Sequence, residues 1–246
     1  LGYNSLYPPQ QLAIDNGLLD DSNLVITTPT ASGKTLIAIL AAIKALEKNK
    51  KVVYLTPLRA LAYEKYLEFA SVDRSSIFTK KIRVRISTGD FNTSKTDLSS
   101  SDIIIMTNEK IDSLLRQNAS WLANVGLFIS DEIHLIGDQE RGPVLEMVLT
   151  KIKKYYPSSQ ILGLSATITN AVEIAAWLKS KLVESSWRPT KLIEGVYSDG
   201  TIYYNNNSRF NISESGKDST SMIIDLIMDS LKNGGQNLIF VETRKR

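Results

Sequence analysis

Five short runs rich in valine, isoleucine and leucine alternate along this chain with segments whose apolar residues recur at three- and four-residue spacing. Strands that alternate with helices indicate a parallel sheet. Runs that are apolar throughout indicate strands covered by helices on both faces. The sequence therefore predicts an α/β fold with a mostly parallel, doubly wound sheet. The expected strands are 23–28, 51–57, 102–107, 125–130 and 160–167, with 81–87 as a sixth candidate, and the expected helices are 34–46, 58–69, 108–116 and 143–155.

The pattern changes near residue 188, where we place a domain boundary. Residues 1–187 contain the predicted sheet, and residues 188–246 are expected to form a linker and an incomplete second α/β domain. The chain opens without methionine and ends just after a strand-like run, so we interpret it as a fragment. The elements expected after the boundary are a hairpin over 191–204, a helix over 219–232 and a strand over 237–242.

Composition excludes several classes of site. The chain has no cysteine, which rules out disulfides, zinc–thiolate sites and cysteine nucleophiles and fits a reducing, cytoplasmic location. No apolar run approaches the roughly 18 residues of a membrane span, so we expect no membrane association. The net charge is only +3. A polyanion would therefore have to be bound by locally placed cations rather than by an overall basic field.

Residues 23–35 have the order strand, small-residue loop and helix start that a phosphate-binding loop requires. In such a loop, backbone N–H groups and the helix N-terminus cradle the phosphates. Lys34 can reach the β- and γ-phosphates, and the Thr35 hydroxyl can bind magnesium. The generic pattern has glycine where this chain has Thr28, so a purely structural turn stays an alternative. The residues expected to hold a nucleotide are Thr30, Ala31, Ser32, Gly33, Lys34 and Thr35.

Two carboxylates, Asp131 and Glu132, follow the expected strand over 125–130, at the sheet edge where α/β proteins bind ligands. Asp131 suits a magnesium position, and Glu132 can orient and deprotonate an attacking water. The alternative is a solvated pair that caps the next helix, but the phosphate loop upstream favours the catalytic interpretation. The single histidine, His134, and the small hydroxyl residues that end the strand over 160–167 indicate little by themselves.

Taken in order, residues 28–35, 131–134 and 165–167 resemble motifs I, II and III of superfamily-two helicases of the DExH type. Within that superfamily the chain looks like the Ski-like branch, and most like archaeal DNA repair helicases of the Hjm type. The resemblance covers nearly the whole chain. The further segments that carry it are Tyr7-Pro8-Pro9-Gln10, residues 56–62, Thr88-Gly89-Asp90, residues 107–110, residues 131–138, Arg141-Gly142-Pro143 and Trp187-Arg188-Pro189.

The resemblance implies a RecA-like P-loop domain over residues 1–187, the beginning of a second RecA-like domain over 188–246, and the cofactors ATP and Mg²⁺. By position, Gln10 would contact adenine, Lys34 and Thr35 would hold phosphate and magnesium, and Asp131 and Glu132 would serve the metal and the water. The residues implied to couple hydrolysis to movement are His134, Ser165 and Thr167, and those implied to contact the nucleic-acid backbone are Arg59, Gly89, Thr107 and, at the start of motif IV, Arg244.

The activity that the resemblance implies is that of an ATP-dependent DNA helicase. Such a motor would move 3′ to 5′ on single-stranded DNA, act as a monomer and unwind forked or branched DNA in repair. Its second domain would supply arginines that stabilise the transferred phosphoryl group, so we expect this chain alone to bind ATP but hydrolyse it poorly. The alternatives are a Ski-like RNA helicase, a P-loop enzyme acting on a small molecule, and a non-catalytic ATP-dependent binding module.

Overall fold

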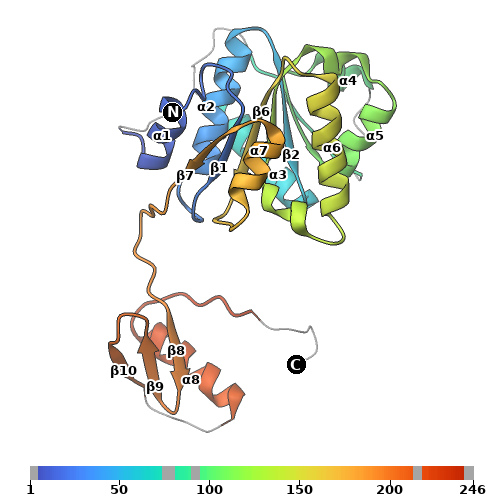
Figure 1. The fold of residues 1–246 in the computed structure, drawn as a ribbon. Coiled ribbons are helices and arrows are strands. Elements are labelled where there is room, and N and C mark those ends of the chain that lie inside the picture. The colour runs from blue at the N-terminus through green and yellow to red at the C-terminus, as the bar shows by residue number, and fades with distance from the viewer. Residues whose placement is uncertain (1–4, 74–80, 90–94, 213–217, 241–246) are drawn as a thin grey trace. The chain divides into compact units, whose positions relative to one another are not determined.

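The computed structural model describes residues 5–73, 81–89, 95–212 and 218–240. The chain divides into two compact units, Leu1–Pro189 and Thr190–Arg246, and Figure 1 draws the elements of both. No helix of the described ranges combines the length and the apolar character needed to cross a bilayer.

The first unit is built on a seven-stranded sheet with the order β3-β4-β2-β5-β6-β1-β7. Every pair of neighbouring strands is parallel, which confirms the predicted α/β fold. Parallel neighbours need crossover connections, and helices supply them. The strands are β1 (Leu24–Thr27), β2 (Lys51–Thr56), β3 (Val84–Ser87), β4 (Ile103–Thr107), β5 (Val125–Ser130), β6 (Gln160–Ser165) and β7 (Lys181–Glu184).

Helices cover both faces of this sheet. Because successive side chains of a strand point to opposite faces, β2 contributes Val52 and Tyr54 to one apolar cluster and Val53 and Leu55 to the other. The first cluster includes buried residues of α1, α2 and α3, and the second includes buried residues of α4, α5, α6 and α7. The helices are α1 (Pro8–Asp15), α2 (Lys34–Glu47), α3 (Arg59–Asp73), α4 (Lys95–Ser100), α5 (Asn108–Arg116), α6 (Gly142–Tyr155) and α7 (Ala171–Leu178).

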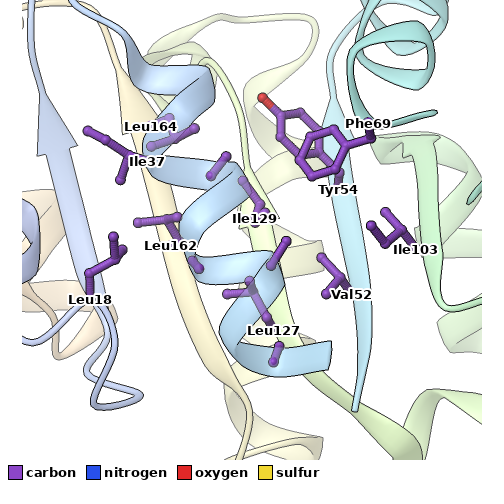
Figure 2. Packing of buried hydrophobic residues seen from close by; sticks show 14 of the residues in the cluster. Leu18, Ile37, Val52, Tyr54, Phe69, Ile103, Leu127, Ile129, Leu162 and Leu164 are labelled. Atoms are coloured by element: carbon purple, nitrogen blue, oxygen red, sulfur yellow. The ribbon is translucent and has the colours of Figure 1, made fainter. Parts of the chain in front are cut away.

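The first cluster fixes α2 across the middle of the sheet. Figure 2 shows Ile37 of α2 lying over Leu162 and Leu164 of β6, with residues of β5 and β2 beyond them. Ile37 and these leucines have no exposed surface. Burying a side chain of this kind is worth about 1.5–3 kcal/mol, so the packing holds the start of α2 firmly against the carboxyl edge of the sheet.

The second unit contains an antiparallel sheet of three strands, β8 (Gly195–Ser198), β9 (Thr201–Tyr204) and β10 (Arg209–Asn211), and the helix α8 (Ser219–Lys232). The hairpin expected over 191–204 is confirmed by the pairing of β8 with β9. Its two turn residues, Asp199 and Gly200, have φ of 49° and 71°. Positive φ at both central residues matches the twist of the flanking strands.

The structure departs from the predicted elements in one expected strand and in several elements that were not predicted. The strand expected over 237–242 does not form over residues 237–240, where Leu238 and Phe240 are 80% and 86% exposed. A strand needs a hydrogen-bonded neighbour, and none is formed in the part of this segment that the structure describes. Residues 241–242 lie outside the described residues. The elements that were not predicted are α1, α4, α7 and β7 of the first unit and β10 of the second.

Candidate nucleotide and nucleic-acid site

Three adjacent strands bring the helicase-like motifs together. In the sheet, β6 lies between β5 and β1. Asp131 and Glu132 directly follow β5, Ser165 ends β6, and the phosphate loop follows β1. The backbone N–H of Thr28 donates to the carbonyl of Ser165 at 3.2 Å, which ties the start of the loop to the end of β6. The three motifs therefore share one stretch of the carboxyl edge.

The phosphate loop is closed around the Lys34 ammonium. Its Nζ donates to the backbone carbonyls of Thr28 at 3.0 Å and Pro29 at 3.2 Å. The hydroxyl of Ser32 donates to Thr28 Oγ1 at 2.7 Å, and Thr28 and Ser32 are both buried. Thr28, which departs from the generic glycine, is thus accommodated by a hydroxyl pair inside the loop. The lysine and the loop backbone are thus arranged as one unit, which is compatible with a phosphate-binding loop.

Backbone conformation also fits a loop that must wrap an anion. Ala31 has φ of 64° and Gly33 has φ of 86°. A β-carbon added to Gly33 would lie 2.2 Å from Nε2 of Gln10. Gln10 is buried at the start of α1, where its Oε1 accepts the Tyr7 N–H at 2.8 Å and its Nε2 donates to the Gly33 carbonyl at 3.4 Å. The structure thus places the predicted adenine-contacting residue directly against the phosphate loop.

Opposing electrostatic effects act on the pKa of Lys34. Burial lowers its pKa below the ordinary lysine value of 10.5, an effect that Glu132 and Asp131 oppose and that the charges of Lys65 and Arg188 reinforce. The influence of both carboxylates places them within electrostatic reach of the loop. An anion with several negative charges would relieve the cost of burying this cation.

Asp131 is held on both carboxylate oxygens. Oδ1 accepts the backbone N–H of Glu132 at 3.0 Å, and Oδ2 accepts the hydroxyl of Tyr54 at 2.8 Å. Burial, followed by the charge and hydrogen bond of Asp131, raises the pKa of Tyr54 well above its ordinary value, so this phenol stays a donor near neutral pH. Glu132 adopts φ of 52°, a left-handed conformation that is unfavourable for a residue with a β-carbon.

The predicted coupling residues are brought together only in part. Nδ1 of His134 lies 3.3 Å from Oε2 of Glu132 and 3.5 Å from the hydroxyl of Ser165. One ring nitrogen can donate to the carboxylate or accept from the hydroxyl, depending on where the proton sits, so this histidine bridges two motifs. Thr167 is exposed and makes neither contact; its coupling role stays a prediction.

Lys65 of α3 is a further charged group at this edge. It is 9% exposed, and its Nζ donates to the Thr35 hydroxyl at 3.1 Å and to the carboxylate of Glu68 at 3.0 Å. Burial acts to lower its pKa, but the hydrogen bond and charge of Glu68, with the charges of Asp131 and Glu64, outweigh burial and raise it. Lys65 was not predicted from the sequence, because the contact depends on how α3 packs beside α2.

The other half of the carboxyl edge forms a groove with a volume of about 630 Å³. It lies where β2, β4 and β3 end, and it brings together three of the four predicted nucleic-acid contacts: Arg59, Gly89 and Thr107. The fourth, Arg244, lies outside the described residues. A β-carbon on Gly89 would lie 2.8 Å from Nη2 of Arg59, so the glycine makes room for that guanidinium. The remaining lining residues are Pro57, Leu58, Ala60, Glu109, Lys110, Ser113 and Arg141.

Lys110 and Arg141 were not among the predicted nucleic-acid contacts. Both belong to segments that carry the helicase resemblance, but neither had a role by position. With Arg59 they give the groove three cations against the single acid Glu109. This is the local concentration of positive charge that the near-neutral chain requires for binding a polyanion.

Comparison with known proteins decides the family. The family model described as DEAD/DEAH box helicase matches residues 7–174, which include the phosphate loop, both carboxylates and the residues that line the groove. The chain belongs to the DEAD/DEAH box helicase family. The predicted resemblance to superfamily-two helicases and the RecA-like fold of the first unit are thereby confirmed, and ATP is the nucleotide of helicases of this family.

Curated relatives extend the similarity over the whole chain. The chain is 45% identical over 244 residues to the ATP-dependent DNA helicase Hel308 of Methanocella arvoryzae and 47% identical over 245 residues to that of Caldivirga maquilingensis, in each case over 99% of this chain. The full length of this chain, 246 residues, is 43% identical to the ATP-dependent DNA helicase Hel308 of Pyrococcus abyssi. The matches cover 32%, 31% and 32% of these relatives, so the chain spans about a third of their length.

The donors at the nucleotide half of the edge fit magnesium and a triphosphate. Magnesium prefers oxygen ligands, is usually bound through one or two carboxylates together with substrate phosphates, and keeps several waters. The Thr35 hydroxyl and the Asp131 carboxylate supply oxygen ligands of this kind, and the loop supplies backbone N–H groups and one ammonium for phosphate.

Proposed function

We propose that this chain is the ATP-binding part of a DNA helicase, in which hydrolysis of magnesium-bound ATP drives movement along single-stranded DNA. The observation that carries the proposal is the division of one sheet edge into two halves. The nucleotide motifs follow β5, β6 and β1, and the cation-lined groove lies where β3, β4 and β2 end. Because β2 and β5 are neighbours, the two sites adjoin.

Each side chain at the nucleotide half has a role that its contacts support. Lys34, already surrounded by loop carbonyls, neutralises the β- and γ-phosphates. Thr35 and Asp131 hold magnesium, which when bound supplies charge stabilisation for phosphoryl transfer. Glu132 orients the attacking water and accepts its proton. His134, placed between Glu132 and Ser165, links the hydrolytic carboxylate to the end of β6.

The groove binds the nucleic-acid backbone without reading its sequence. Guanidinium and ammonium groups from Arg59, Lys110 and Arg141 neutralise phosphates, and such contacts position a strand but carry no base information. Binding of this kind weakens steeply with salt. The names of the curated relatives favour DNA over RNA as the strand.

The finer properties follow from the resemblance and are part of the proposal. They are movement 3′ to 5′, action as a monomer on forked or branched DNA in repair, and a cytoplasmic location. We propose that residues 1–187 form the first RecA-like motor domain and that residues 188–246 form the linker and beginning of the second, to which Arg244 would contribute a nucleic-acid contact.

The test is steady-state ATP hydrolysis by the complete protein, with and without single-stranded DNA or RNA. DNA-stimulated hydrolysis that is lost in Lys34→Ala and Glu132→Gln would support the proposal. Glu146→Gln is the matched control, because Glu146 is an exposed carboxylate on α6 and its loss should leave hydrolysis unchanged.

The same assay separates the alternatives. Stimulation by RNA alone would assign the protein to the RNA helicases. Hydrolysis that no strand stimulates would favour a P-loop enzyme acting on a small molecule. ATP and DNA binding without any turnover dependent on Glu132 would identify a non-catalytic binding module.

A further inference from the structure

Tyr54 brings a buried hydroxyl to the carboxylate that the proposed function assigns to magnesium. Tyr54 is 1% exposed, and its hydroxyl donates to Oδ2 of Asp131, itself 8% exposed, at 2.8 Å. A buried phenol hydroxyl needs a partner, and here the partner is a functional carboxylate rather than a backbone carbonyl. Packing alone would be satisfied by an apolar residue, as it is by Val52 two positions earlier on the same face of β2.

The pairing of β2 with β5 holds Asp131 next to Tyr54. Leu55 of β2 pairs with Ser130, the last residue of β5, and the backbone N–H of Asp131 then donates to the Leu55 carbonyl at 2.9 Å. Asp131 is thus fixed to β2 twice, by its backbone through Leu55 and by its side chain through Tyr54. The other carboxylate oxygen accepts the backbone N–H of Glu132. Of these two donors, which both come from described residues, the Tyr54 hydroxyl belongs to a side chain and can be removed by substitution.

Packing restrains the phenol ring of Tyr54 beside the carboxylate. The ring of Phe69, on α3, packs edge-on against it, with centroids 5.4 Å apart and planes at 64°. Phe69 is also 1% exposed. Figure 2 shows the two rings in contact at the end of the cluster, with the Tyr54 oxygen pointing away from the apolar side chains. The donor is therefore held in place before any ligand arrives.

We infer that Tyr54 is a positioning residue that fixes the Asp131 carboxylate in the orientation needed for magnesium. The inference rests on the proposed function. Groups that hydrogen-bond to metal ligands orient them, and their loss typically lowers metal affinity 10- to 100-fold. A merely structural role for the Tyr54 hydroxyl would affect stability and leave the magnesium dependence of nucleotide binding unchanged.

The test compares ATP affinity in excess magnesium and in excess chelator for the wild type and Tyr54→Phe, which removes the hydroxyl and keeps the ring. We expect the gain in affinity that magnesium provides to fall about 10- to 100-fold in Tyr54→Phe, while the affinity without magnesium changes less than twofold. Tyr63→Phe is the control, because Tyr63 is 49% exposed on α3 and should leave both affinities unchanged.

A double-mutant cycle shows whether the effect passes through Asp131. In an Asp131→Asn background, Tyr54→Phe should cause no further loss of magnesium dependence, whereas independent effects would add. An unchanged magnesium dependence in Tyr54→Phe, in a wild type that shows one, would overturn the inference and leave the proposed function standing. If the ATP affinity of the wild type did not depend on magnesium, both the inference and the proposed function would be overturned.

Discussion

Gly33→Ala tests the geometry of the phosphate loop with a single methyl group. Gly33 has φ of 86°, and a left-handed residue with a β-carbon costs about 1–2 kcal/mol. The new β-carbon would also lie 2.2 Å from Nε2 of Gln10. Gln10 would have to leave its contacts with the Gly33 carbonyl and the Tyr7 N–H, each worth about 0.5–1.5 kcal/mol. Together these effects place the loss of unfolding free energy at about 2–5 kcal/mol.

Tryptophan fluorescence during urea unfolding measures this loss. All three tryptophans, Trp121, Trp177 and Trp187, belong to the first unit, so the signal reports on that unit alone. Gly137→Ala is the matched control, because a β-carbon there meets nothing within 4 Å and should change stability by less than about 1 kcal/mol. If the two variants were equally stable, the described loop conformation and its contact with Gln10 would be refuted.

Three further predictions concern charged groups at the same edge. ATP affinity should decline as pH rises, and the decline should begin below pH 10.5, because burial lowers the pKa of Lys34 and phosphate binds the charged lysine. Binding of an ATP analogue, measured without magnesium at a series of pH values, tests this. Gly89→Ala displaces Arg59 and should weaken single-strand binding about tenfold, or about 1.4 kcal/mol, in fluorescence anisotropy, with urea unfolding unchanged. Lys65→Met removes a partly buried pair with Glu68 and should destabilise the first unit by about 1 kcal/mol. Because the pKa of Lys65 is raised despite its burial, the charged lysine stabilises the fold at every pH below the ordinary lysine pKa of 10.5. The loss of stability in Lys65→Met should therefore persist from neutral pH up to 10.5. A loss that vanished already near neutral pH would contradict a stabilising charge on Lys65.

The sheet was predictable because its strands are continuously apolar. Runs such as residues 102–107 and 125–130 can be buried on both faces only in a parallel sheet with helices on each side, and the structure has that arrangement. The edge strand β7 escaped prediction because it is four residues long, begins with Lys181 and ends with Glu184, and buries only Val183. Short edge strands of this composition lack the apolar pattern on which the prediction depends.

The gathering of the proposed nucleotide residues at one edge of the sheet was predictable for a related reason. Lys34, Asp131 and Glu132 follow strands, and the carboxyl ends of parallel strands meet at one edge. Contacts that depend on which strands are neighbours were not accessible. The hydrogen bond from Tyr54 to Asp131 joins residues 77 positions apart in the sequence and requires β2 to lie beside β5. Arg141 likewise reaches the groove only because of how the segment before α6 folds.

We propose that the loop around Lys34 binds magnesium-bound ATP, and equilibrium binding of ATP to this chain tests this proposal. Lys34→Ala should lower the affinity at least tenfold, because it removes the ammonium at the centre of the loop; a charge-assisted contact of this kind is worth about 1.5–3 kcal/mol. Lys44 is a partly exposed lysine in the last turn of the same helix, and Lys44→Ala should bind ATP as the wild type does. Equal affinities in the two variants would show that the Lys34 ammonium does not bind the phosphates.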